Sequence, residues 1–108
     1  MPYKRVWAIF QPFTFSRTAR HLNQFAEALA MADEVIVSDI MGSRETNEWQ
    51  VSSKQITDQI DGAHYLATFE EISRFVADNA CPGDLVLTMG GGDVYKCARM
   101  IRSLLETK

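Results

Sequence analysis

Cysteine and long apolar runs are scarce in this chain, and each shortage excludes a class of protein. Cys81 and Cys97 are its two cysteines, too few and too unpatterned for a disulfide framework or a zinc site. We therefore expect a reducing compartment and a cytoplasmic location. No segment approaches the roughly 20 apolar residues that cross a bilayer, and no small-residue cleavage site follows the short apolar run after the basic N-terminus.

An excess of positive charge is missing as well. The formal net charge is -3 and the isoelectric point lies near 5.3, which argues against a nucleic-acid binder with a basic face and against a polybasic membrane module. Hydrophobic residues make up 46% and charged residues 23%, close to the averages for folded soluble domains. We expect residues 1–108 to form one domain whose partners are small molecules or proteins.

Strand patterns and helix patterns alternate four times along the chain. Apolar or β-branched runs predict strands at 6–10, 34–40, 64–68 and 84–89. Apolar residues at helical spacing predict helices at 17–31, over Ile56 and Ile60, at 70–79 and at 94–105. This alternation predicts an α/β fold with an open, mainly parallel sheet and helices on both faces, a Rossmann-like three-layer domain with about four strands and four helices.

Apolar content also predicts the strand neighbours. The first and last strands are the most apolar, so we expect both to be central and adjacent, whereas the strand at 64–68 should be peripheral. Ser52 or Ser53 is expected to cap the short helix that follows, and Gly62 to end it. Residues 41–51 form an unusually long connection, in which Trp49 is expected to pack over the domain edge or against another domain.

Polar residues follow the first strand, where open α/β sheets usually bind ligands. Gln11, Thr14, Ser16 and Arg17 lie between this strand and the next helix. Arg17 can hold a carboxylate or phosphate through paired hydrogen bonds, or it can be an ordinary solvated residue, and the two interpretations are about equally good. For Arg20, one helical turn later, the solvated interpretation is the better one.

A glycine turn follows the last strand. Gly90, Gly91 and Gly92 have no Cβ, so a ligand or a neighbouring loop can approach their backbone closely. The alternative of equal weight is a tight turn into the final helix, with Asp93 as its N-cap. The turn matches neither a dinucleotide fingerprint nor a P-loop.

Catalytic machinery is not recognisable in the chain. We find no nucleophile with a base, no carboxylate pair and no metal-ligand spacing, and we interpret His21 and His64 as structural. The residues alone therefore predict a ligand-binding α/β domain whose crevice is formed by two turns and a long loop.

A family resemblance extends this interpretation. Residues 10–18 read Phe-Gln-Pro-Phe-Thr-Phe-Ser-Arg-Thr, and five further segments follow in matching order, at 25–28, 32–40, 43–45, 51–53 and 82–96. Together they resemble the C-terminal domain of the Mur ligases over nearly the whole chain. The branch of the family that they resemble most is the one that joins L-alanine to UDP-N-acetylmuramate in peptidoglycan synthesis.

The resemblance implies one part of a three-domain, ATP-dependent ligase. The UDP-sugar domain and the central domain, with its ATP P-loop and magnesium site, are absent from this chain, so we expect no ligase activity from it alone. The resemblance implies that Arg17 interacts with the carboxylate or developing negative charge of the amino acid. We predict Thr14 and Ser16 as further substrate contacts, and Gly90, Gly91, Gly92 and Asp93 as nucleotide contacts, but no family role at the positions of Phe13 and Thr14 can be carried over. Phe13 stands where the family usually has histidine, and Thr14 where some members have arginine.

Two other functions compete with the ligase. The chain can be a self-standing module that binds a nucleotide or anion through its glycine turn, or a scaffold in which Trp49 and the long loop contact a partner. Measurable binding of ATP or L-alanine by the chain alone favours the module.

Overall fold

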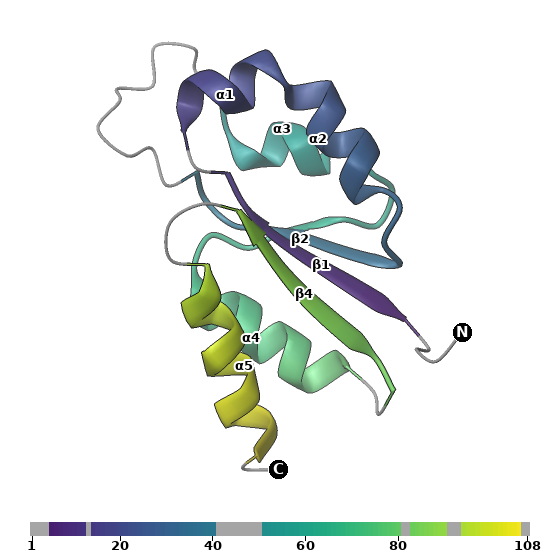
Figure 1. The fold of residues 1–108 in the computed structure, drawn as a ribbon, viewed down its shortest axis with the longest axis vertical. Coiled ribbons are helices and arrows are strands. Elements are labelled where there is room, and N and C mark those ends of the chain that lie inside the picture. Colours follow the sequence, from purple (N-terminus) through teal and green to yellow (C-terminus); the bar gives the residue numbers. More distant parts are fainter. Residues whose placement is uncertain (1–4, 13, 41–50, 81–82, 91–93, 107–108) are drawn as a thin grey trace.

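The fold is a parallel sheet between two layers of helices (Figure 1). A computed structural model describes residues 5–12, 14–40, 51–80, 83–90 and 94–106. In these residues the sheet consists of β1 (Val6–Gln11), β2 (Glu34–Val37), β3 (His64–Tyr65) and β4 (Leu85–Gly90), in the order β3-β2-β1-β4. Each neighbouring pair is parallel, which confirms the predicted fold class.

Helices cover the sheet on both faces, as the strand and helix alternation predicts. Helices α1 (Phe15–Arg20), α2 (Leu22–Leu29) and α3 (Ser53–Thr57) lie on one face, and α4 (Phe69–Asn79) and α5 (Tyr95–Glu106) lie on the other (Figure 1). The connection after β1 therefore runs to one face and the connection after β4 to the opposite face.

The core has two halves because side chains of β1 alternate between the faces. Trp7 and Ile9 pack in the cluster under α4 and α5, which includes Ile72, Val76, Cys97 and Ile101. Ala8 packs in the other cluster, with partly buried Phe10 against it, under α2 and α3. Since β1 is buried on both faces and paired on both sides, it is the central strand that its apolar run predicts.

The predicted position of β4 is half right. It pairs with β1, as expected, but it is an edge strand of the described sheet and not a central one. Its alternate residues Leu87 and Met89 are 43% and 37% exposed, since no described helix covers them. A strongly apolar run shows that a strand can be buried, but the neighbouring elements decide whether it is.

Several predicted boundaries are also wrong. The helix predicted at 17–31 is divided into α1 and α2, because His21 leaves the helical region with φ -118° and ψ 26°, so the described chain has five helices and not four. The predicted strands at 34–40 and 64–68 end early, at Val37 and Tyr65. Helix α3 ends at Thr57, before Ile60 and before Gly62, which was predicted to end it. Its N-cap is Ser52, one of the two predicted caps, whose backbone N–H donates to Gln55 Oε1 at 3.1 Å.

Candidate functional site

The carboxyl ends of β1 and β4 lie side by side where their connections diverge to opposite faces (Figure 1). Such a switch point is where open α/β sheets usually bind ligands. A cavity of about 190 Å³ lies here. Its lining brings together the two predicted turns: Phe10, Gln11, Thr14, Arg17, Thr18, Phe25 and Gly90.

Helix α1 positions Arg17 at this cavity. Thr14 is the N-cap of α1, and its Oγ1 accepts a hydrogen bond from the Arg17 backbone N–H at 3.3 Å. Thr18 Oγ1 in turn donates to the Thr14 carbonyl at 2.6 Å. The Arg17 side chain is exposed and has no ion-pair partner among the described residues. Its guanidinium is therefore available to an anion, whereas the Thr14 hydroxyl already serves as a cap.

Ser16 is the predicted site residue that the structure leaves apart. It is half-buried in the first turn of α1 and is not among the described residues that line the cavity. Its assignment to the amino acid therefore stays a prediction without support from the geometry.

Gly90 is required by the packing of β4 against β1. Its φ is +129°, and a Cβ built on it would lie 2.2 Å from the Gln11 carbonyl oxygen. Any other residue would therefore push the two strand ends apart. The structure thus explains Gly90 through the neighbouring strand, while the predicted site residues Gly91, Gly92 and Asp93 lie outside the described residues.

Gln11 is more prominent in the structure than its place in the sequence suggests. The residue is 7% exposed, and its Oε1 is buried without a hydrogen-bond partner among the described residues. An unsatisfied buried acceptor costs about 1 to 3 kcal/mol of stability. The signal available from sequence is a polar residue directly after the five apolar residues 6–10 of a buried strand, before Pro12.

A second cavity, of about 320 Å³, lies next to the first and shares Gln11 with it. It is lined by Gln11, Ser38, Asp39, Ile40, Ala67, Thr68 and Phe69. The Tyr65 hydroxyl donates a hydrogen bond to Asp39 Oδ1. This bond raises the pKa of Tyr65 above its ordinary value, with smaller contributions from burial and from the charges of Asp39 and Glu71. One carboxylate oxygen of Asp39 is therefore occupied by the protonated Tyr65 hydroxyl.

Two comparisons with known proteins bear on this arrangement. A family model described as "Mur ligase, glutamate ligase domain" matches residues 1–92, which include all four strands and the switch point. The chain belongs to this Mur ligase family.

Three curated relatives of this Mur ligase domain are named UDP-N-acetylmuramate–L-alanine ligase. The protein from Alkaliphilus metalliredigens is 46% identical over 103 residues, which cover 93% of the chain and 22% of that relative. The protein from Agathobacter rectalis is also 46% identical, over 88% of the chain and 22% of the relative. That from Desulfitobacterium hafniense is 42% identical, over 93% of the chain and 23% of the relative. The chain thus spans about a fifth of their length.

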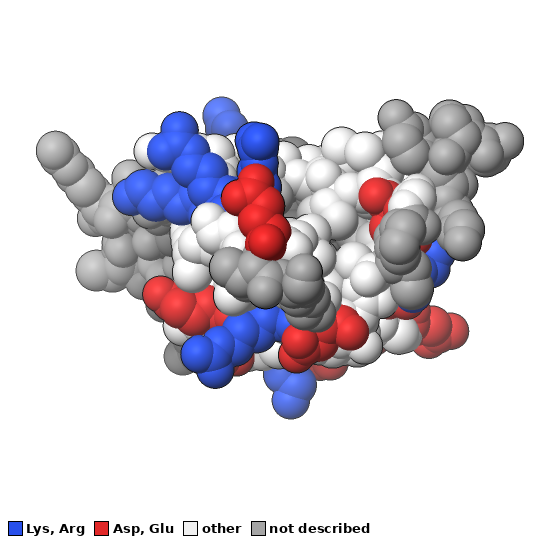
Figure 2. Space-filling view, turned by 90° about the horizontal axis from the view of Figure 1, so that it is seen from below, with Lys and Arg blue, Asp and Glu red and all other residues white. Residues whose placement is uncertain are grey.

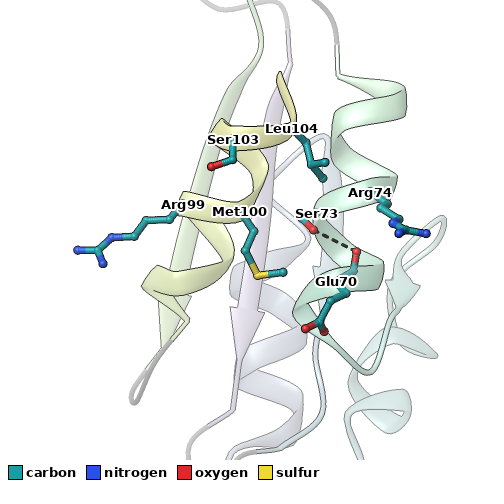
Figure 3. A pocket seen from close by; sticks show the side chains of 7 residues that line it. All are labelled: Glu70, Ser73, Arg74, Arg99, Met100, Ser103 and Leu104. Carbon is teal, nitrogen blue, oxygen red and sulfur yellow. Dashed lines mark hydrogen bonds between the residues drawn. The ribbon is translucent and has the colours of Figure 1, made fainter. Parts of the chain in front are cut away.

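A larger cavity of the Mur ligase domain, about 400 Å³, lies between α4 and α5 and has different chemistry (Figure 3). Met100 and Leu104 lie between the helices, while the charged ends of Arg74 and Arg99 point away from each other (Figure 3). The Arg99 guanidinium instead lies over the Tyr95 ring, with its central carbon 5.2 Å from the ring centroid. Because the two arginines diverge and the Ser73 hydroxyl donates to the Glu70 carbonyl within α4 (Figure 3), we interpret this cavity as a groove between packed helices.

Two further reactive side chains in the described part of the domain, Cys97 and His64, are engaged in packing. Burial raises the pKa of the Cys97 thiol to about 11, so it is protonated near neutral pH. The His64 ring packs against the Phe75 ring, with the centroids 4.6 Å apart and the ring planes tilted by 50°. Among residues 5–12, 14–40, 51–80, 83–90 and 94–106, no three His, Cys, Asp or Glu side chains gather as a metal site would require.

Charged side chains of both signs lie close together on the surface (Figure 2). On the face shown in Figure 2, Lys and Arg side chains lie next to Asp and Glu side chains. None of the helices in the described segments combines the length and apolar character needed to cross a membrane.

Proposed function

We propose that the chain is the C-terminal domain of an ATP-dependent ligase that joins L-alanine to UDP-N-acetylmuramate in cytoplasmic peptidoglycan synthesis. The names of relatives at 40 to 46% identity over most of the chain support this proposal. Because the chain spans about a fifth of their length, the activity belongs to the whole protein. The UDP-sugar domain and the ATP-binding domain are the partners that this domain closes against.

The observation that most supports this function is the position of the Arg17 side chain at the switch-point cavity. A guanidinium without an ion-pair partner among the described residues, beside a cavity of about 190 Å³, suits the carboxylate of a small amino acid. Such a pair forms two parallel charge-assisted hydrogen bonds. Arg17 thereby fixes the orientation of L-alanine.

The described residues fit this role better than they fit a magnesium or nucleotide site. They contain no group of metal-binding side chains, and Gly90 makes room for the Gln11 carbonyl. We therefore assign magnesium and most ATP contacts to the central domain, and keep Gly91, Gly92 and Asp93 as predicted nucleotide contacts. ATP would activate the sugar carboxylate, while this domain holds the amino acid in place and screens the site from water.

A domain exchange tests the proposal. The chain replaces the matching region of the Alkaliphilus metalliredigens ligase, and phosphate release is measured with UDP-N-acetylmuramate and ATP, with and without L-alanine. We expect release that depends on L-alanine, and none from the chain alone. A folded chimaera without alanine-dependent release, beside an active parent ligase, would contradict the proposed function.

Within an active chimaera, Arg17→Ala is the decisive substitution. Loss of the paired hydrogen bonds should lower kcat/KM for L-alanine roughly 100-fold, equivalent to about 2.7 kcal/mol. Arg20→Ala is the matched control, since Arg20 is exposed on the same helix and does not line the cavity. Equal kinetic effects of the two substitutions would remove Arg17 from the site.

A further inference from the structure

The second cavity at the carboxyl edge offers acceptors without a cation. Among the described residues, no Lys or Arg lines it. Gln11 Oε1 is buried and has no hydrogen-bond partner among the described residues. Asp39 is exposed, and its Oδ1 accepts from the Tyr65 hydroxyl, while its Oδ2 forms no hydrogen bond within the described part of the chain. A cavity with these groups favours a ligand that donates hydrogen bonds and carries positive charge.

Gln11 connects this cavity to Arg17. Side chains of β1 alternate, so Gln11 projects to the same face as Trp7 and Ile9, toward α4 and α5. Arg17 lies on the other side, in α1, and Gln11 lines both cavities. A small ligand above the end of β1 therefore meets a cation on one side and acceptors on the other, an arrangement complementary to a zwitterion.

Other polar groups of the second cavity are already engaged. Thr68 Oγ1 accepts from the Glu71 backbone N–H at 3.2 Å, because Thr68 caps α4. The Ser38 hydroxyl donates to the Asp39 carbonyl at 3.3 Å. Gln11 and Asp39 therefore offer the strongest acceptors among the described lining residues, a carboxamide oxygen and a carboxylate oxygen.

We propose that Gln11 Oε1 and the Asp39 carboxylate bind the amino group of the amino-acid substrate. This inference rests on the proposed function, in which the amine is the nucleophile. Two acceptors on the N–H hydrogens restrict rotation of the amine and direct its nitrogen, while Arg17 holds the carboxylate. Gln11 and Asp39 are positioning residues that select for a free amine next to the carboxylate.

The test uses the chimaeric ligase and two ligands that differ only in the amine. Propionate keeps the methyl and carboxylate of L-alanine but lacks its amino group. In Gln11→Met and in Asp39→Asn, we expect the KM for L-alanine to rise at least tenfold, while the inhibition constant of propionate changes less than threefold. Asp58→Asn, at an exposed position beyond α3, is the control and should change neither constant.

The outcomes separate the two proposals. If the unsubstituted chimaera releases no alanine-dependent phosphate, the proposed function fails and the inference fails with it. If the chimaera is active but both substitutions leave the KM for L-alanine unchanged, the inference alone is wrong. Parallel losses for L-alanine, propionate and ATP would indicate a structural role and would also overturn it. Gln11→Glu, which retains an acceptor, should keep the KM for L-alanine closer to that of the parent than Gln11→Met does.

Discussion

The amino edge of the sheet, where the parallel strands begin, and the carboxyl edge, where they end, differ in how their polar groups are paired. At the amino edge, Arg5 donates to Asp84 Oδ2 at 3.0 Å, to Glu34 Oε1 at 3.4 Å and to the Asn79 carbonyl at 2.9 Å. Trp7 Nε1 also donates to Asp84 Oδ2 at 3.0 Å. Asp84, whose side chain is 2% exposed, thus links the beginnings of β1 and β4.

At the carboxyl edge, the corresponding groups are left open. Gln11 Oε1 is buried without a partner in the described part of the chain, and the Arg17 side chain has no ion-pair partner there. Gln11 and Arg17 both line the switch-point cavity, whereas Arg5, Trp7 and Asp84 do not. Under the proposed function, the amino edge stabilises the fold, while the carboxyl edge keeps groups free for a ligand at some cost in stability.

The largest expected effect comes from Gly90→Ala, which breaks the carboxyl edge sterically. A Cβ would lie 2.2 Å from the Gln11 carbonyl oxygen at a φ of +129°, so we expect a loss of at least about 3 kcal/mol in the free energy of unfolding. Urea denaturation measures it. Gly62→Ala is the control, because Gly62 has a φ of +78° but open space around it, and it should cost about 1 kcal/mol. Equal costs would show that the close approach of the strands is not what requires Gly90.

Asp84→Ala removes the side chain that links the beginnings of β1 and β4. Removal of the shared acceptor of Arg5 and Trp7 should lower the free energy of unfolding by about 2 to 3 kcal/mol. Because the site lies at the opposite edge, the KM for L-alanine in the chimaera should not change. Asp61→Ala, an exposed position, controls for loss of a negative charge. A raised KM with unchanged stability would reverse the roles assigned to the two edges.

Gln11→Met should have the smallest effect on stability, and it tests whether the buried carboxamide at the carboxyl edge lacks a partner. Replacing an unsatisfied buried carboxamide with an apolar side chain of similar length should raise the free energy of unfolding by about 1 kcal/mol. The same substitution weakens L-alanine binding if our inference is correct. A loss of stability in thermal or urea denaturation would mean that the carboxamide is satisfied in solution.

Particular residues show how far sequence reasoning reached. The apolar run of β1 predicted a central strand, and the neighbouring position of the last strand followed from the same argument. The Arg17 turn and the Gly90 turn were predicted to share one crevice, and Arg17 and Gly90 do line one cavity. Thr14 also lines this cavity but caps α1, because side-chain hydrogen bonds within a turn depend on backbone angles that the sequence does not reveal.

The sequence by itself determined the order of strands and helices, the parallel sheet and the family, because hydrophobic periodicity and local motifs are properties of neighbouring residues. Only the tertiary structure decided that β4 is an edge strand, that Gly90 makes room for the Gln11 carbonyl, and that Gln11 and Asp39 line one cavity. Those features depend on contacts between residues far apart in the chain, where burial and the lack of a partner arise from packing and not from residue type.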